Sequence, residues 1–361
     1  MKRSFVFAIL LGVLAPPGFP AQRGQRAAAP AGASCDRACL LSIADTYLAA
    51  LVAHDPSKAP MAPGAKFTEQ AQVMAAGEGG LWKYATGVST SFKIPVPDPV
   101  IGQIGMLVMM KQSGSAPGGG GRGAAPPAPG APVPDRDIQL ALRLKVVNRQ
   151  ITEAEHIMAT IGANSIANLQ TPRPALLATV PPAERTPRPF MLLIGNAYYD
   201  SIVQSNGDAV PYADDCGRRE NGMHTAGAGA PPRPAAPPAA AGAAPPRGGG
   251  GGFGPPQSCR DQINSRGLSY ITSIDLRRVW IADEEKGLVF GLTMFRQPME
   301  SKSVTILNPD GTTQERPMNF NPFDLEAAHI FKIHGGKLHE IEAMGFSLPL
   351  NSKNGWSPFV R

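Results

Sequence analysis

The chain has 361 residues, a net charge of +6 and an isoelectric point near 9.2, which leaves room for two ordinary domains. Its lysines and arginines are scattered in short runs, so the clustered basic face of a nucleic-acid-binding protein is missing and no nucleic-acid partner is expected. The 40 glycines and 38 prolines are concentrated in a few stretches, so the remainder has the composition of a globular protein.

The first 21 residues are typical of a secretory signal peptide. Lys2 and Arg3 precede the apolar run FVFAILLGVLA, which small residues and prolines follow. The run is shorter than the about 20 residues of a membrane-spanning helix, so no span is expected. These features predict a secreted or periplasmic protein with a disordered tail at 22–34.

A first domain is predicted at 35–165. It begins with a helix at 36–54, because apolar residues recur at helical spacing and Pro56 ends the pattern. A turn-rich segment continues to Glu69, and a flexible glycine- and proline-rich insertion lies at 113–135. Strands are predicted at 91–96, 102–110, 139–147 and 150–158.

A second domain is predicted at 190–350, after a proline-rich linker at 166–189. It repeats the same order, with a low-complexity insertion at 225–257 and a C-terminal tail at 351–361. The expected elements are a helix at 190–203, a turn segment ending at 220–222, a short helix within 259–271, and strands at 273–280, 287–295, 327–333 and 337–344.

The two predicted domains are related in sequence. Residues 191–223 align with 40–72 without a gap, which places Tyr198 on Tyr47 and Glu220 on Glu69. The final hairpins align too, and pair Glu340 with Glu153. Two related domains in one chain offer the option of packing on each other as a pseudo-dimer.

Several motifs carry a resemblance to a known fold. They are CDRAC-x7-YLAALVAHDPS, FTEQAQ, ADDC-x3-ENG and DLRRVWIADEEKGLVFG. The chain resembles a family of secreted proteins of unknown function with tandem nuclear transport factor 2-like (SnoaL-like) domains. That resemblance implies an α+β fold of two cone-shaped domains, each a curved antiparallel sheet wrapped on helices. It implies no reaction, because this fold serves enzymes and non-catalytic binders alike.

A carboxylate beside an amide ends the turn segment of both copies, as Glu69–Gln70 and Glu220–Asn221. Glu220 is the candidate catalytic base, and Asn221 with Tyr198 are the candidate donors to an oxyanion. The alternative is a structural clamp, in which these side chains satisfy backbone groups of an irregular segment.

Four charged residues near Glu220 occur in the second copy only. Asp214, Asp215, Arg218 and Arg219 stand where the first copy has only uncharged residues, namely Pro63, Gly64, Phe67 and Thr68. They are candidates for substrate binding, with arginine as a bidentate donor. The alternative is a solvated ion-pair network of little energetic value.

Secondary candidates lie on the helix stripe and on the last hairpin of each copy. Tyr47, like Tyr198, either faces a pocket or is a core residue with a satisfied hydroxyl. The acids of the final strands either end up exposed or point into the cavity, where burial would raise their pKa toward a general-base value. The secondary set comprises Tyr47, Glu69, Gln70, Glu340, Glu342 and His329, with Glu153 and Glu155 as counterparts.

The six histidines show no metal-ligand spacing, although His329 and His339 are close enough in sequence to meet across the final hairpin. No metal or cofactor is expected, since no phosphate-binding glycine loop is found either.

The four cysteines predict disulfides, because pairing is the default in an oxidising compartment. A Cys216–Cys259 bond would tie the ends of the second insertion together. A Cys35–Cys39 bond requires a loosened helix start, since one helical turn is near the limit of a disulfide's reach.

The sequence supports two hypotheses about function. The first is a lyase, dehydratase or isomerase that uses general acid–base catalysis on a small organic molecule in the pocket of the second domain. The alternative is a non-catalytic module that binds a ligand or a protein. The substrate cannot be inferred from the sequence.

Overall fold

The computed structural model describes residues 35–114, 134–227 and 257–356. The predicted signal peptide and tail lie outside these ranges. Most of both predicted insertions and the last residues of the C-terminal tail also lie outside the described residues.

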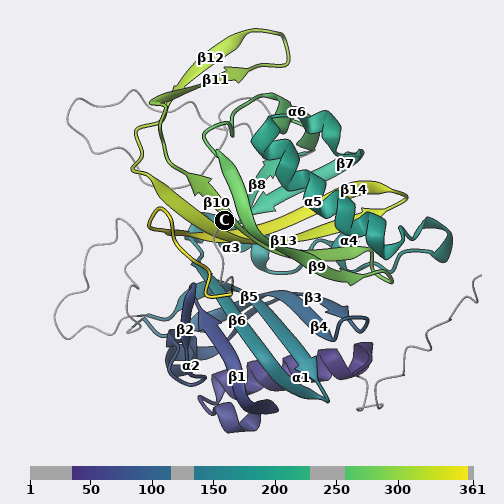
Figure 1. Ribbon diagram of the computed structural model, residues 1–361, viewed down its shortest axis with the longest axis vertical. Helices are drawn as coiled ribbons and strands as arrows, with labels where there is room; N and C mark the ends of the chain where they lie inside the picture. Colours follow the sequence, from purple (N-terminus) through teal and green to yellow (C-terminus); the bar gives the residue numbers. More distant parts are fainter. Residues whose placement is uncertain (1–34, 115–133, 228–256, 357–361) are drawn as a thin grey trace, which may run out of the picture. The chain divides into compact units, whose positions relative to one another are not determined.

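The N-terminal half is a six-stranded sheet with a long helix on one face (Figure 1). Its strand order is β2-β1-β6-β5-β4-β3, and all neighbours are antiparallel except β1 and β6, which are parallel. The elements are α1 (Arg37–Val52), β1 (Met61–Glu69), β2 (Gln72–Met74), α2 (Gly80–Tyr84), β3 (Ala85–Asp98), β4 (Gln103–Gln112), β5 (Arg136–Val147) and β6 (Gln150–Thr160).

The C-terminal half repeats this topology. Its strand order is β8-β7-β14-β13-β10-β9, with β7 parallel to β14 and the other neighbours antiparallel. The elements are α5 (Arg188–Gln204), β7 (Tyr212–Glu220), β8 (Met223–Ala226), α6 (Cys259–Asn264), β9 (Ser273–Asp283), β10 (Leu288–Gln297), β13 (Phe323–His334) and β14 (Lys337–Leu348). The fold is therefore α+β, with two six-stranded sheets and few helices.

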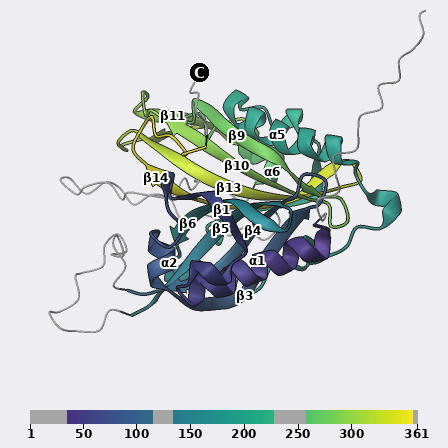
Figure 2. The ribbon, with the colours of Figure 1, turned by 60° about the horizontal axis from the view of Figure 1, so that its bottom comes forward.

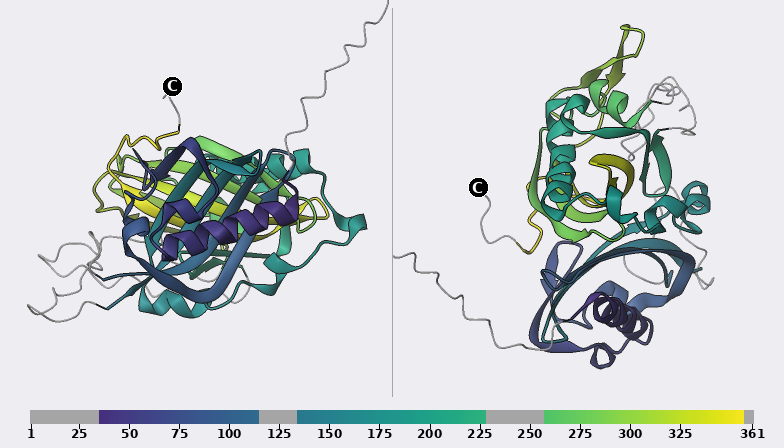
Figure 3. Two further views of the ribbon diagram at one scale, coloured as in Figure 1. Left: turned by 90° about the horizontal axis from the view of Figure 1, so that it is seen from below. Right: turned by 90° about the vertical axis from the view of Figure 1, so that its right-hand side faces the viewer.

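Each long helix packs its apolar stripe on its own sheet. Figure 2 shows α1 and α2 against the first sheet, and α5 and α6 against the second. Asp36 caps α1 by accepting a hydrogen bond from the backbone N–H of Cys39 (2.9 Å), which satisfies one of the free amides at the helix start. Below, the sheet face that meets the helix is called the inner face, and the opposite face the outer face (Figure 3).

Two predicted turn segments are strands instead. The segment before Glu69 forms β1 and that before Glu220 forms β7, each paired in parallel with a distant strand. Their sequences are rich in glycine, alanine, proline and charged residues and contain one β-branched residue, Thr68, so local propensity gives little strand signal. The β11–β12 hairpin (Ser303–Leu307 and Thr313–Pro317) was also missed.

The segment between the two sheets is not a plain linker. It contains α3 (Ala163–Ile166), α4 (Pro174–Leu177) and a turn of 3-10 helix at Pro182–Glu184. Proline occupies the first turn of α4, where its missing N–H costs nothing.

Both faces of the central strands are buried. The described residues belong to one compact unit, and a single apolar cluster contains Leu107 and Met109 of β4 together with Phe290 and Leu292 of β10. The inner faces contribute to two separate clusters, one under each long helix. The outer faces of the two sheets therefore form a shared core.

Both predicted disulfides are formed. Cys216 of β7 is bonded to Cys259 of α6, and Cys35 is bonded to Cys39. The second bond is possible because helix α1 begins at Arg37, which leaves Cys35 outside it with a Cα–Cα distance of 5.2 Å. Among the described residues, no helix is long and apolar enough to cross a membrane.

Candidate functional site

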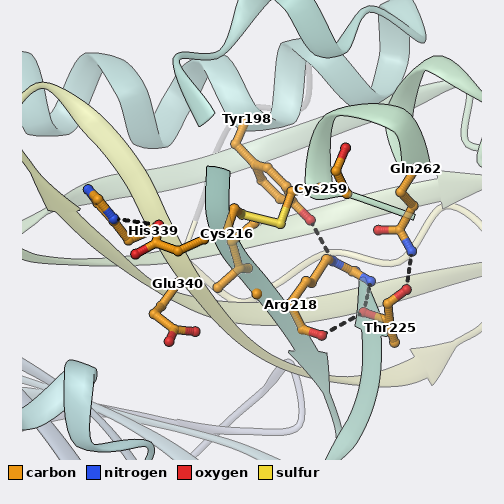
Figure 4. The surroundings of a disulfide bond; sticks show 12 residues. Tyr198, Cys216, Arg218, Thr225, Cys259, Gln262, His339 and Glu340 are labelled. Carbon is orange, nitrogen blue, oxygen red and sulfur yellow. Dashed lines mark hydrogen bonds and ion pairs between the residues drawn. A yellow bond between two sulfur atoms is a disulfide. The ribbon is translucent and has the colours of Figure 1, made fainter. Parts of the chain in front are cut away.

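The inner face of the second half carries a hydrogen-bonded network centred on Arg218. Its guanidinium donates from Nε to the Tyr198 hydroxyl (2.9 Å) and from Nη1 to the Thr225 hydroxyl (2.8 Å). A third bond runs from Nη2 to the carboxylate of Glu220 (2.8 Å). Figure 4 shows Arg218 between Tyr198 and Thr225, beside the Cys216–Cys259 disulfide. The structure thus brings three predicted site residues together.

This network changes the chemistry of Tyr198. Its hydroxyl accepts from Arg218, which can only donate, so the hydroxyl's own proton remains available. Burial raises the pKa of Tyr198, although the charge of Arg218 opposes the rise. Tyr198 is therefore a neutral phenol with a proton to donate, fixed in place by a buried cation.

Arg218, a predicted substrate-binding residue, is bonded to protein groups through all three of its nitrogens. The pKa of Arg218 is raised, because Tyr198 and Glu220 outweigh the opposing effect of burial. Arg218 positions Tyr198 and Glu220.

The predicted charged cluster does not gather into one site. Adjacent residues of a strand face opposite ways, so Arg218 lies on the inner face, whereas the next residue, Arg219, donates to the backbone carbonyl of Asn168 (3.1 Å). Asp214 is exposed, and Asp215 is bonded to His339 at the surface (2.7 Å). The four residues therefore do not surround one point, and their role in substrate binding stays a prediction.

Asn221 and Gln70 act as backbone clamps. Asn221 donates to the carbonyl of Gly345 (3.3 Å) and accepts from its N–H (3.1 Å), which occupies both ends of the amide. Gln70 makes the same pair of bonds to Met158 (3.0 and 2.6 Å). These contacts match the clamp alternative, because each amide uses its oxygen and one N–H on the backbone.

The first half has a different polar chain at the equivalent place. The Tyr47 hydroxyl is bonded to His156 Nε2 (2.9 Å), and His156 Nδ1 is bonded to Glu69 (3.2 Å). Because a carboxylate only accepts, Nδ1 carries a proton toward Glu69, and Nε2 shares the hydrogen bond with the Tyr47 hydroxyl. Glu69 also accepts from the backbone N–H of Gly80 (2.5 Å). Every polar group of this chain is therefore satisfied.

His329 lies deep in the second half among aromatic rings. It is 2% exposed, stacked with Phe295 and Phe331 at centroid distances of 5.7 and 5.6 Å, and edge-on to Tyr199 at 5.2 Å. Its Nδ1 is buried without a hydrogen-bond partner. Burial, reinforced by the charge of Arg218, holds the pKa of His329 well below its usual value, so the ring is neutral at pH 7.

Two hydroxyls near His329 also lack a hydrogen bond of standard geometry. They belong to Tyr199 and Thr293, both buried. Burial raises the pKa of Tyr199 well above its usual value, and the nearby Thr293 hydroxyl opposes this. Space is made by Gly291, which pairs with His329 in the sheet and whose Cα faces the Tyr199 hydroxyl.

The repeat shows that this polar surface is particular to the second half. At the observed strand pairings, His329 corresponds to Leu142, Thr293 to Val108 and Tyr199 to Leu48. All three first-half residues are buried and apolar. Polar residues at apolar positions of a repeat are the signal through which Tyr199 and Thr293 could have been found.

The acids of the final strands bind arginines on the outer faces. Glu155 is bonded to Arg143 (2.9 Å) and to Arg278 (2.6 Å). Burial works to raise the pKa of Glu155, but these two cations outweigh it and lower the pKa. Glu155 is therefore buried without the raised pKa that one of the two alternatives implied. Glu153 binds Arg143 and Lys145 (2.8 and 3.0 Å).

In the second half, the corresponding acids both bind Arg173, which follows the first sheet. Glu342 lies 3.1 Å from Arg173, and Glu340 is paired with the same guanidinium. Burial raises the pKa of Glu342 despite the charge of Arg173. Neither acid faces the inner surface where Tyr198 lies.

His329 and His339 do not meet. His329 pairs with Ala343 across the hairpin, whereas His339 stacks on His334 at 3.7 Å between centroids. No group of three or more histidine, cysteine or acidic residues in the described ranges is arranged to hold a metal ion.

An open cleft of about 580 Å³ lies on the outside of the second half. It is bounded by Phe190 and Leu193 of α5, by residues 183–187 and by the β13–β14 turn. The two α5 side chains are 59% and 63% exposed, so apolar surface borders this cleft.

Comparisons with known proteins give a family match for one half only. A family model described as "Domain of unknown function (DUF8021)" matches residues 184–345. Among solved structures, AclR from Streptomyces galilaeus aligns at 13% identity with a TM-score of 0.25, over 34% of this chain and 77% of AclR. No curated protein matches in sequence. The AclR likeness is too weak to support an argument about function.

Proposed function

We propose that the second half binds a small organic molecule at its inner face, beside His329, Tyr198 and Tyr199. The proposal includes a secreted or periplasmic location, which the two disulfides support. It also includes assignment of both halves to the nuclear transport factor 2-like fold, which the repeated helix-and-sheet topology and the sequence motifs support.

The observation that carries the proposal is the unpartnered Nδ1 of His329. A buried polar atom without a hydrogen bond costs about 1 to 3 kcal/mol, so native structures rarely keep one without a use for it. The available proton of Tyr198 adds a donor to the same region. A ligand with a hydroxyl or carbonyl group would satisfy these atoms.

The charges of the region define the kind of ligand. His329 is neutral, and the charge of Arg218 is already balanced by Glu220. The flanking rings of Phe295, Phe331 and Tyr199 are apolar apart from one hydroxyl. The region therefore suits an uncharged, partly apolar molecule.

A second candidate function is acid–base catalysis of the lyase, dehydratase or isomerase type. It is favoured by the neutral imidazole of His329, which lies 5.6 Å between ring centroids from Tyr198, a phenol that can donate. His329 would take a proton, and Tyr198 would donate to the developing oxyanion. Glu220, the base expected from the sequence, would then orient Tyr198 through Arg218 rather than accept the proton.

The binding proposal is tested with a library of uncharged hydroxyl- and carbonyl-containing fragments, screened by thermal shift and measured by calorimetry. His329→Leu installs the residue of the first half. We expect it to weaken binding about tenfold, the value of one hydrogen bond of about 1.4 kcal/mol.

The matched control is His156→Leu, which removes the buried histidine of the first half and should leave the affinity unchanged. Equal binding by wild type and His329→Leu would contradict the proposal, as would a library that yields no binder at all.

The two candidate functions are separated by following a bound ligand by NMR over time. Conversion by wild type, lost in His329→Leu and strongly slowed in Tyr198→Phe, supports acid–base catalysis. Binding without conversion leaves a binding module.

A further inference from the structure

Equivalent residues of the two halves meet each other across the shared core. Arg37 is the first residue of α1, and its counterpart Arg188 is the first residue of α5. Asp98 ends β3, and its counterpart Asp283 ends β9. Arg37 is paired with Asp283 (2.6 Å), while Arg188 is paired with Asp98 (2.7 Å). Each half thus gives an arginine and receives one.

This reciprocity defines an isologous interface, in which the same surface is used on both sides. The contacting strands agree with it, because β3 touches β9, β4 touches β10 and β6 touches β14. Gly105 and Phe290 are themselves counterparts and face each other so closely that a Cβ on Gly105 would lie 2.2 Å from the Phe290 ring. A residue meets its own counterpart only near a twofold axis.

The segments that follow the last strand of each half are also exchanged. After β6, Asn168 donates to the carbonyl of Gly222 in the turn beyond β7 (2.8 Å). After β14, Gly355, the counterpart of Asn168, lies against Ala71, the counterpart of Gly222. Trp356 then donates to the hydroxyl of Thr68 at β1 (2.8 Å).

A departure from symmetry has a simple chemical cause. Asp98 accepts a further hydrogen bond from the backbone N–H of Ala282 (2.9 Å), but the counterpart of Ala282 is Pro97, which has no N–H. Accordingly, Oδ2 of Asp283 is buried without a hydrogen bond. The asymmetry results from one proline rather than from a different mode of packing.

We infer that the chain is a fused dimer, whose two halves are complementary subunits held by a reciprocal interface rather than by the connecting segment. Each outer sheet face is complementary to the outer sheet face of the other half. It follows that the two outer faces cover each other and that a ligand binds at another surface of the protein.

The test uses the full chain with a site-specific protease sequence placed between Pro181 and Glu184, where the residues are exposed. After folding and cleavage, we expect both fragments to elute together in size-exclusion chromatography with light scattering at micromolar concentration. Separation of the fragments under these conditions would overturn the inference.

Reciprocity is tested in the cleaved protein. Arg37→Glu and Arg188→Glu should each weaken fragment association at least about tenfold and to a similar extent, because both leave a buried aspartate facing a like charge. The exchanged pair Asp98→Arg with Arg188→Asp should recover part of the loss. Arg277→Glu, which breaks the Arg277–Asp200 pair within the second half, is the control and should have no effect.

Two results would contradict an isologous interface. One is fragment association unaffected by either arginine substitution, with native circular dichroism of the uncleaved variants. The other is a strong effect of one substitution and none of the other.

Discussion

The inner faces of the two halves differ in how completely their buried polar side chains are hydrogen-bonded. In the first half, the Tyr47 hydroxyl is bonded to His156, and His156 donates to Glu69. In the second half, Tyr198 accepts from Arg218, which also holds Glu220. The tyrosine of the first half is bonded to a histidine nitrogen, which can accept as well as donate, whereas the tyrosine of the second half is bonded to an arginine, which can only donate.

The exchange of the bridging residue explains this difference. Phe67 of β1 corresponds to Arg218 of β7, and His156 of β6 corresponds to Ala343 of β14. The residue that bonds to the tyrosine therefore lies on β6 in the first half and on β7 in the second. The acid and the tyrosine keep their places. A change of two residues on neighbouring strands thus replaces the histidine partner of the tyrosine with an arginine, which can only donate to it.

The largest change in stability is expected from replacing the residue that links the tyrosine to the acid, which is Arg218 in the second half and His156 in the first. We expect Arg218→Met to lower the free energy of unfolding by about 3 to 5 kcal/mol. The substitution removes the hydrogen bonds from Arg218 to the carboxylate of Glu220 and to the hydroxyls of Tyr198 and Thr225. His156→Leu should cost less, since Glu69 keeps its backbone N–H donors. Urea unfolding measures both variants; a larger loss for His156→Leu would contradict the comparison.

The disulfides give a second contrast between the halves. Cys216 and Cys259 are 43 residues apart, and Cys35 and Cys39 are 4 apart. Chain entropy predicts a loss of about 4 kcal/mol for removing the first bond and about 2 kcal/mol for the second. Thermal unfolding of the two double serine variants tests this order, and equal losses would show that loop entropy is not the main term.

Glu326 should make the stability of the second half depend on pH, because its counterpart in the first half is the uncharged Gln139. Burial and the nearby Glu155 raise the pKa of Glu326 to about 8, against the opposing charge of Arg278. Its folded pKa is above the unfolded value of about 4.3, so the stability it contributes is complete at low pH and is lost as pH rises toward 8.

The expected slope is up to about 1.4 kcal/mol per pH unit between about pH 5 and 8, from the one proton held by the folded state alone. Glu326→Gln, which installs the first-half residue, should remove that slope and leave stability nearly constant. Chemical unfolding at several pH values measures it. An unchanged slope in the variant would show that Glu326 is ionised in the folded protein.

The smallest effect is expected where the halves are alike. Asn221→Ala and Gln70→Ala each remove two hydrogen bonds to the backbone and should each cost about 1 to 2 kcal/mol. Neither should alter ligand affinity. A selective loss of binding in Asn221→Ala would restore the oxyanion-donor role for this residue.

Much of the fold could be predicted because its signals are local. The apolar stripe from Leu40 to Leu51 predicts α1, and the β5–β6 hairpin follows from two apolar runs around Asn148 and Arg149, both in the left-handed conformation. Strands β1 and β7 were missed because their partners are distant strands. No local pattern in these segments indicates parallel pairing.

The site was predicted in part for the same reason. Tyr198, Arg218 and Glu220 were found from the alignment of the two copies within one continuous stretch. Tyr199, Thr293 and the central place of His329 depend on three separate elements brought together by the sheet. Arg218 and Arg219 could not be separated without knowing that their segment is a strand.

The location of a bound ligand tests the central claim most directly. We predict that a crystal structure with the tightest-binding fragment shows it within hydrogen-bond distance of His329 Nδ1, beside Tyr198 and Tyr199. A fragment held instead in the outer cleft at Phe190 and Leu193, with the surroundings of His329 unchanged, would contradict the account.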